Sequence, residues 1–204
     1  IVSFRKWDLD LFAFADRALA LINQQTKLDI NAYSNVHSFL EQRITGLLKT
    51  NGIAYDVIDS VMHIDKSHLH DLENRAEALN DLKGKEDFIQ LVIGFKRVAN
   101  IIAETKEFIP LQKDKLIEPE EIKLYQGLQV LHQDIDSALQ KKDYPLALQK
   151  LIQFGKVIDD FFDAVLVNCE DKTLSANRHS LLREVKKEFL RVADLSLIVL
   201  ETGQ

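Results

Sequence analysis

Apolar residues recur every three or four positions along most of this chain, which is the spacing of one face of an α-helix. The clearest example is residues 86–106, where the apolar positions are Phe88, Leu91, Val92, Phe95, Val98, Ala99 and Ile102. No stretch alternates apolar and polar residues for long enough to indicate a strand. The pattern therefore predicts an all-α fold built as a helical bundle.

The same periodicity divides the chain into a series of predicted helices. In order they cover residues 8–24, 34–49, 55–63, 67–81, 86–106, 118–139, 143–155, 157–169 and 175–200. Asn51-Gly52 is a typical helix C-terminus, and Pro119 and Pro145 suit the first turns of their helices. Gly155 is expected to bend the chain, and residues 108–117 are expected to form a loop.

The first predicted helix carries its own apolar face, made of Leu11, Phe14, Ala15, Ala18, Leu21 and Ile22. A polar stretch over residues 24–35 follows it. Glycine and mixed charges over residues 82–86 mark the expected boundary between two helical groups. We therefore expect a smaller helical segment over residues 1–85 and a second helical domain over residues 86–204.

The composition is that of an ordinary folded protein, with 46% hydrophobic and 28% charged residues. No apolar run approaches the length of a membrane span, and the first ten residues contain no secretory signal. The single cysteine, Cys169, excludes an internal disulfide and fits a reducing compartment. We expect a cytoplasmic protein, and Ile1 in place of Met suggests a piece of a longer chain.

The formal net charge of −6 argues mildly against a nucleic-acid partner, because phosphate contacts need Lys and Arg. Residues 172–191 differ from this average, since they contain six basic residues against Glu184 and Glu188. Within them Arg183, Lys187 and Arg191 recur at every fourth position and form a basic stripe on one helix face. The plainer interpretation is a solvated face on which the two glutamates pair with neighbours.

A second basic group lies in residues 86–106, where Lys96, Arg97 and Asn100 share a face opposite Phe95 and Ile102. A cation beside a carboxamide suits nucleic acid, because the charge holds phosphate while the amide reads a base edge. Periodicity and charge alone support only a helical domain that binds something anionic.

The remaining polar clusters have structural explanations that we favour over catalytic ones. His63, His68, His70 and Asp71 are reminiscent of metal-dependent phosphohydrolases, but their ligand set is incomplete. Three glutamates, Glu118, Glu120 and Glu121, are placed to stabilise a helix dipole. Asp159, Asp160, Asp163, Glu170 and Asp171 are expected to form a solvated acidic patch, and Cys169 a buried, inert thiol. No phosphate-binding glycine loop or nucleophile motif is present, so catalysis is not expected within this chain.

Several ordered motifs resemble those of bacterial glycyl-tRNA synthetase beta subunits. They are LIEPEEIKL at residues 116–124, FKRVANI at 95–101, VIDDFFDAVLV at 157–167, EDK at 170–172, NR at 177–178 and FLRVADLSL at 189–197, with DVIDSV at 56–61 and NRAEAL at 74–79. The likeness covers residues 36–200. One departure is Phe95, which stands where the family has Asn before Lys-Arg.

The resemblance implies a helical anticodon-binding domain, similar to that of arginyl-tRNA synthetases, preceded by a segment that contacts the tRNA body. It implies a non-catalytic role in glycine–tRNA ligase, with tRNA(Gly) and the alpha subunit as partners in an assembly of two alpha and two beta subunits. ATP and Mg²⁺ belong to the alpha subunit in such an enzyme, so no cofactor is expected in this chain.

We therefore predict that this chain binds tRNA(Gly) and helps to recognise its anticodon. The predicted RNA-binding residues are Lys96, Arg97, Asn100, Asn177, Arg178, Arg183, Lys187 and Arg191. Because anticodon bases are usually splayed out and stacked on aromatic rings, an exposed Tyr125 or Tyr144 is expected to join them. The alternative function is a helical module that docks the alpha subunit or another beta subunit, which a large exposed apolar patch would favour.

Overall fold

The computed structural model describes residues 5, 7, 9–105 and 109–200. Within these ranges the chain is helical and contains no strand, apart from one isolated bridge between Asp10 and His68. The all-α prediction is confirmed. The chain divides into two compact units, residues 1–81 and 82–204, and each is described by itself. None of the described helices is both long and apolar enough to cross a membrane.

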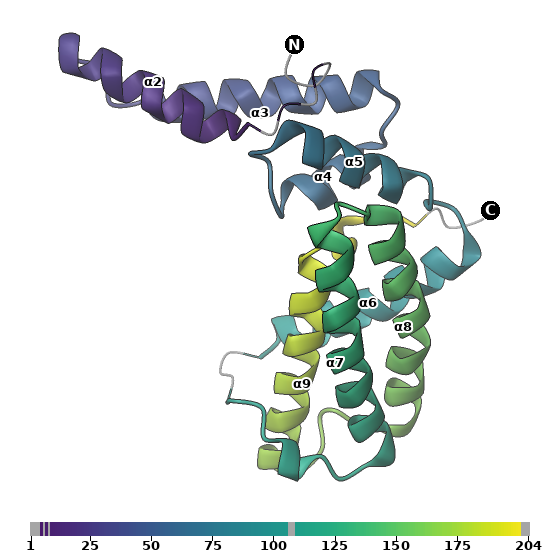
Figure 1. Cartoon of the computed structure of the whole chain (residues 1–204). Helices are drawn as coiled ribbons and strands as arrows, with labels where there is room; N and C mark the ends of the chain where they lie inside the picture. The colour runs from purple at the N-terminus through teal and green to yellow at the C-terminus, as the bar shows by residue number, and fades with distance from the viewer. Residues whose placement is uncertain (1–4, 6, 8, 106–108, 201–204) are drawn as a thin grey trace. The chain divides into compact units, whose positions relative to one another are not determined.

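The first unit contains four described helices. They are α2 (Leu11–Gln25), α3 (Ala32–Thr50), α4 (Tyr55–Met62) and α5 (Leu69–Asn80), with α2 beside α3 and α4 beside α5 (Figure 1). Asp10 caps α2 by accepting a hydrogen bond of 2.8 Å from the N–H of Ala13. Gly52 ends α3 with a φ of +83°, and the N–H of Ile53 then donates to the carbonyl of Leu48. The helix end predicted at Asn51-Gly52 is therefore confirmed, because this left-handed geometry favours glycine.

Helix α2 buries a different face from the one that its periodicity predicted. Phe12 and Leu19 are its buried residues, whereas Phe14, Leu21 and Ile22 are 63%, 48% and 47% exposed. The apolar stripe at helical spacing is thus on the outside of this structure. Periodicity identified the stripe, but the sequence alone does not say what covers it.

The second unit contains the remaining four described α-helices and two short 3-10 turns. They are α6 (Glu86–Ala103), η1 (Lys113–Lys115), α7 (Pro119–Gln140), α8 (Tyr144–Ala164), α9 (Lys172–Leu190) and η2 (Leu195–Leu197). Helices α7, α8 and α9 lie side by side, and α6 crosses behind them (Figure 1). Phe95 of α6 stacks on Phe189 of α9 with ring centroids 4.7 Å apart, and both rings are fully buried.

Gly155 does not bend α8, which continues through it as one helix to Ala164. Gly155 is instead the point where α6 crosses α8, because a Cβ there would lie 3.2 Å from Leu91. The helix then ends before Cys169, contrary to the prediction. Val165 takes an extended conformation, and both Val165 and Val167 are buried.

The last helix, α9, is also shorter than predicted. It ends at Leu190 instead of continuing to residue 200, and η2 follows it. Val192, Ala193 and Leu195 are all fully buried. A continued helix would spread these three residues around its circumference, so leaving the helix allows all of them to reach the core.

Candidate nucleic-acid interface

The eight residues predicted to bind RNA occupy three different environments in the second unit. Lys96, Arg97 and Asn100 lie on the outer face of α6; Asn177 and Arg178 lie inside the N-terminal half of α9; Arg183, Lys187 and Arg191 lie toward its C-terminal end. The structure does not bring the eight together on one surface.

Of the α6 group, Arg97 lines a hollow of about 350 Å³ between α6, the end of α8 and the segment that follows it. Arg97 is exposed, and its guanidinium carbon lies 4.2 Å from the centroid of the Phe162 ring. Asn168 also lines the hollow, and Asn100 is exposed one helical turn beyond Arg97. A flat cation against an aromatic ring, with carboxamides nearby, suits stacking and hydrogen bonding with a nucleobase.

Carboxylates of α8 lie near Arg97, so the α6 face is not a simple positive patch. Burial, followed by repulsion from Asp163 and Asp160, raises the pKa of Asp159, while Arg97 acts in the opposite direction. These carboxylates reduce the attraction of Arg97 for phosphate. The geometry therefore suits contact with a base more than contact with the backbone.

Asn177 is fully buried and holds the backbone of the segment between α6 and α7. Its Oδ1 accepts a hydrogen bond of 2.8 Å from the N–H of Gln112, and its Nδ2 donates one of 2.9 Å to the carbonyl of Gln112. Ser180, one turn further along α9, donates to the carbonyl of Ile109 at 2.7 Å. In this conformation Asn177 has no surface with which to contact RNA.

Arg178 is buried beside it and joins three segments of the chain. Its Nε donates to Glu121 at 2.5 Å, and its Nη1 donates to the carbonyl of Leu166 at 2.8 Å. Glu121 is itself fully buried, and its other oxygen accepts from the N–H groups of Ile117 and Glu118. Like Asn177, Arg178 therefore has an architectural role in this structure.

Sequence reasoning missed the importance of Glu121. A glutamate three residues after the helix N-cap is the signature of a capping box, which the structure contains at Glu118 and Glu121. That signal was available in the sequence. The pairing with Arg178, which lies 57 residues away, left no local signal.

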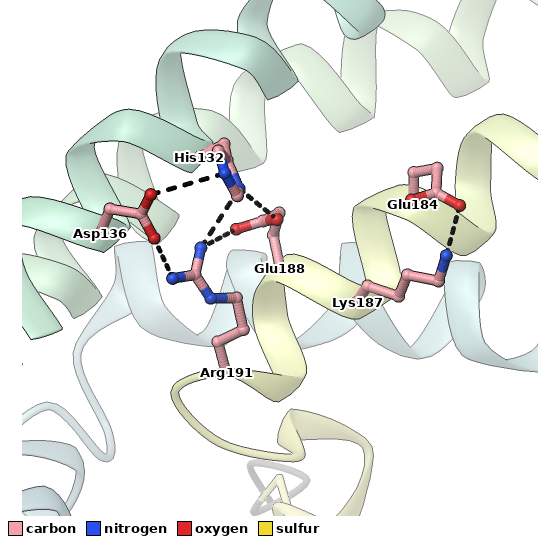
Figure 2. Close-up of polar contacts among 6 residues, drawn as sticks. All are labelled: His132, Asp136, Glu184, Lys187, Glu188 and Arg191. Atoms are coloured by element: carbon pink, nitrogen blue, oxygen red, sulfur yellow. Dashed lines mark hydrogen bonds and ion pairs between the residues drawn. The ribbon is translucent and has the colours of Figure 1, made fainter.

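The basic side chains toward the C-terminal end of α9 are tied to carboxylates (Figure 2). Arg191 donates to Asp136 of α7 and, at 2.8 Å, to Glu188. His132 Nδ1 lies 2.8 Å from the other oxygen of Glu188. The hydrogen bond from Arg191 lowers the pKa of Asp136.

Lys187 completes this face by donating to Glu184 at 2.6 Å (Figure 2). Arg183, on the same helix, is half-buried. The expectation that Glu184 and Glu188 pair with neighbours is confirmed. The stripe therefore offers phosphate a weaker positive field than its sequence indicates.

The two tyrosines proposed as stacking platforms differ in exposure. Tyr144 is only 3% exposed and packs in the core, so the expectation of an exposed ring there was wrong. Tyr125 is half-buried, and the ammonium of Lys113 lies 5.0 Å from its ring centroid. Only Tyr125 of the pair has a face that a base can reach.

The other polar clusters do not form a metal-holding group in the described ranges. No group of three or more His, Cys, Asp or Glu residues there is arranged to hold a metal ion. His68 lies 3.4 Å from Asp65, and His70 lies 3.4 Å from Asn74. Cys169 is half-buried, with its thiol directed at the Asp171 carbonyl.

Comparison with known proteins finds a family match within the second unit. The profile of the DALR anticodon binding domain matches residues 91–195. The chain is 30% identical over 202 residues to the glycine–tRNA ligase beta subunit of Clostridioides difficile (strain 630), covering 98% of this chain and 29% of that protein.

Two further relatives carry the same name. The beta subunit of Mannheimia succiniciproducens is 34% identical over 187 residues, which cover 91% of this chain and 26% of that protein. The beta subunit of Desulforamulus reducens is 32% identical over 179 residues, 87% of this chain and 26% of that protein. The chain thus spans less than a third of the length of these relatives.

Proposed function

The chain belongs to the DALR anticodon-binding domain family, and we propose on that premise that it binds tRNA(Gly) and helps to recognise its anticodon. The observation that carries the proposal is the hollow beside α6, where Arg97 lies against the Phe162 ring. This hollow falls inside the region that matches the family. It combines a flat cation, an aromatic ring and the carboxamide of Asn168, with Asn100 one helical turn from Arg97. Such groups bind unstacked RNA bases.

In this proposal an anticodon base inserts beside Arg97 and stacks against its guanidinium plane. Asn100 and Asn168 then read the edge of the base, since a carboxamide offers both a donor and an acceptor. Lys96, half-buried beside Arg97, supplies charge for a neighbouring phosphate. None of these groups takes part in bond making or breaking.

We further propose that the chain acts as part of a glycine–tRNA ligase beta subunit in the cytoplasm. The relatives that carry this name support the assignment. An alpha subunit would bind ATP and Mg²⁺ and carry out the chemistry, in an assembly of two alpha and two beta subunits. The role of this chain is then to select the tRNA.

Two substitutions of Arg97 test the proposal, with binding of tRNA(Gly) measured at two salt concentrations. Arg97→Ala removes both plane and charge, and we expect a loss of affinity of about tenfold. Arg97→Lys keeps the charge but loses the plane, so affinity should fall while the salt slope is retained. Lys123→Ala, which removes an exposed lysine of α7, is the control. Unchanged affinity in both Arg97 variants would reject this face as the binding site.

A second candidate function is docking of the alpha subunit by the first unit. The exposed stripe of Phe14, Leu21 and Ile22 on α2 favours it, because such an apolar face is typical of a protein interface. Replacing Phe14 and Leu21 with serine should weaken association with the alpha subunit and leave tRNA affinity unchanged. If the double variant binds the alpha subunit like the parent chain, this candidate is excluded.

A further inference from the structure

A second hollow, of about 410 Å³, lies between α7, α9 and the segment that contains η1. It shares no lining residue with the hollow beside Arg97. Its polar lining consists of Lys113, Tyr125, Gln129, His132, Glu184 and Glu188. Tyr125 is the one lining residue that the sequence already pointed to as a stacking platform, and the other polar residues of this lining were not predicted to bind RNA.

The walls of this hollow suit a flat ring. Leu128, which is only 4% exposed, supplies an apolar surface, and Tyr125 presents a half-buried ring. The exposed Lys113 lies over that ring with its ammonium 5.0 Å from the centroid. An aromatic ring beside a cation matches a nucleotide, whose base stacks on a ring while its phosphate meets the charge.

The two carboxylates in the lining are not equivalent. Both oxygens of Glu188 are engaged, one with His132 and the other with Arg191, each at 2.8 Å. Glu184 has one oxygen engaged, by Lys187 at 2.6 Å. Among the residues that the structure places, Lys187 is the single partner found for Glu184, so the second oxygen of Glu184 can accept a hydrogen bond from a ligand.

We propose that this hollow binds one unstacked base of the tRNA and that Glu184 recognises the exocyclic amino group of a cytosine. A carboxylate accepts a hydrogen bond from the cytosine amino group. Uracil has a carbonyl oxygen at the same place, which would face the carboxylate without a proton between them. This inference rests on the proposed function, since it requires the bound RNA to be tRNA(Gly). Glycine codons begin with two guanines, so the anticodon of this tRNA contains two adjacent cytosines.

The variant Glu184→Gln tests directly whether the Glu184 carboxylate recognises cytosine. An amide has nearly the same shape as the carboxylate, but its NH₂ group can also donate a hydrogen bond. The experiment measures affinity for tRNA(Gly) and for two tRNAs in which one or the other of these cytosines is replaced by uracil. We expect the unsubstituted chain to prefer cytosine at one of the two positions by about tenfold. In Glu184→Gln that preference should disappear, with affinity for the uracil-containing RNA rising.

A gain of affinity for uracil is a result that simple damage to the fold cannot produce. The matched control is Glu120→Gln, because Glu120 pairs with Lys123 three residues later, as Glu184 pairs with Lys187, but lies outside the hollow. This control should keep the preference for cytosine. Tyr125→Leu should lower affinity for all three RNAs by a similar factor, since stacking does not distinguish the two bases.

The outcomes separate this inference from the proposed function. If the unsubstituted chain prefers cytosine and Glu184→Gln retains the same preference, the reading by Glu184 is overturned while anticodon recognition stands. If the unsubstituted chain binds all three RNAs equally, Glu184 does not discriminate and the chain does not read these anticodon positions. Both proposals are then rejected.

Discussion

The two halves of α9 carry similar polar residues but use them in opposite ways. Asn177 and Arg178, near the start of the helix, are buried and hold other parts of the chain in place. Lys187 and Arg191, near its end, are accessible to solvent and pair with carboxylates on the surface. The comparison teaches that a basic residue in a family motif can be part of the architecture instead of the binding surface.

The difference follows from what water can do at each position. If Arg178 is removed, Glu121 remains as a buried carboxylate without its cation, and no solvent reaches it to compensate. If Arg191 is removed, water hydrates Asp136, whose side chain is 43% exposed. An arginine–carboxylate pair is therefore essential to the stability of the fold in the first half of α9. In the second half such a pair contributes little to stability.

The largest expected effect is that of Arg178→Met on stability. The substitution leaves the charge of Glu121 buried and unpaired, so the free energy of unfolding should fall by about 3–5 kcal/mol. Denaturant unfolding measures this change. The control is Arg191→Met, which makes the same replacement in the exposed half and should have a much smaller effect. Similar losses in both variants would contradict the contrast between the two halves.

A smaller effect is expected for Asn177→Ala. This change removes both hydrogen bonds to the backbone of Gln112, and the free energy of unfolding should fall by about 2 kcal/mol. Asn100→Ala, on the exposed face of α6, serves as the comparison and should change stability by less than about 0.5 kcal/mol. Hydrogen exchange of the Gln112 amide should also become faster in Asn177→Ala alone.

The smallest effect concerns the titration of Asp136. Its pKa is lowered from 3.8 mainly by the hydrogen bond from Arg191, so its carboxylate stabilises the fold above that pH and stops doing so as the pH falls through the lowered value. Arg191→Ala should return the pKa of Asp136 toward 3.8. The stability difference between the two proteins should then shrink as the pH falls below 3.8. NMR titration of the Asp136 carboxyl carbon measures the shift, and an unchanged midpoint would show that Arg191 is not its cause.

Much of the fold was predictable, because helix periodicity and end signals depend on neighbouring residues. The Asn51-Gly52 terminus of α3 is one example, and the start of α7 at Pro119 is another. The errors arose where tertiary packing decides. The chain leaves the helix after Leu190 so that the following residues reach the core. Gly155 does not bend α8 but lets α6 pack closely against it.

The candidate site was less predictable for the same reason. Sequence spacing correctly placed Arg97 and Asn100 on an exposed helix face. It did not indicate that Phe162, far along the chain, lies under Arg97, or that carboxylates from α7 and α9 neutralise Arg191. Burial of Arg178 depends on Glu121, which no local pattern connects to it. Charge in a sequence therefore identifies candidates, while packing assigns their roles.

The hydrogen bonds that hold the segment before α7 have a consequence for which positions accept amino-acid substitutions. Asn177 and Ser180 hold the segment through the backbone atoms of Gln112 and Ile109 and do not touch their side chains for this purpose. Nearly any amino acid at positions 109 and 112 can therefore be held in the same path. A saturation library should find these two positions permissive and positions 177 and 180 restrictive, which would let the outer surface diverge while the route of the chain stays constant.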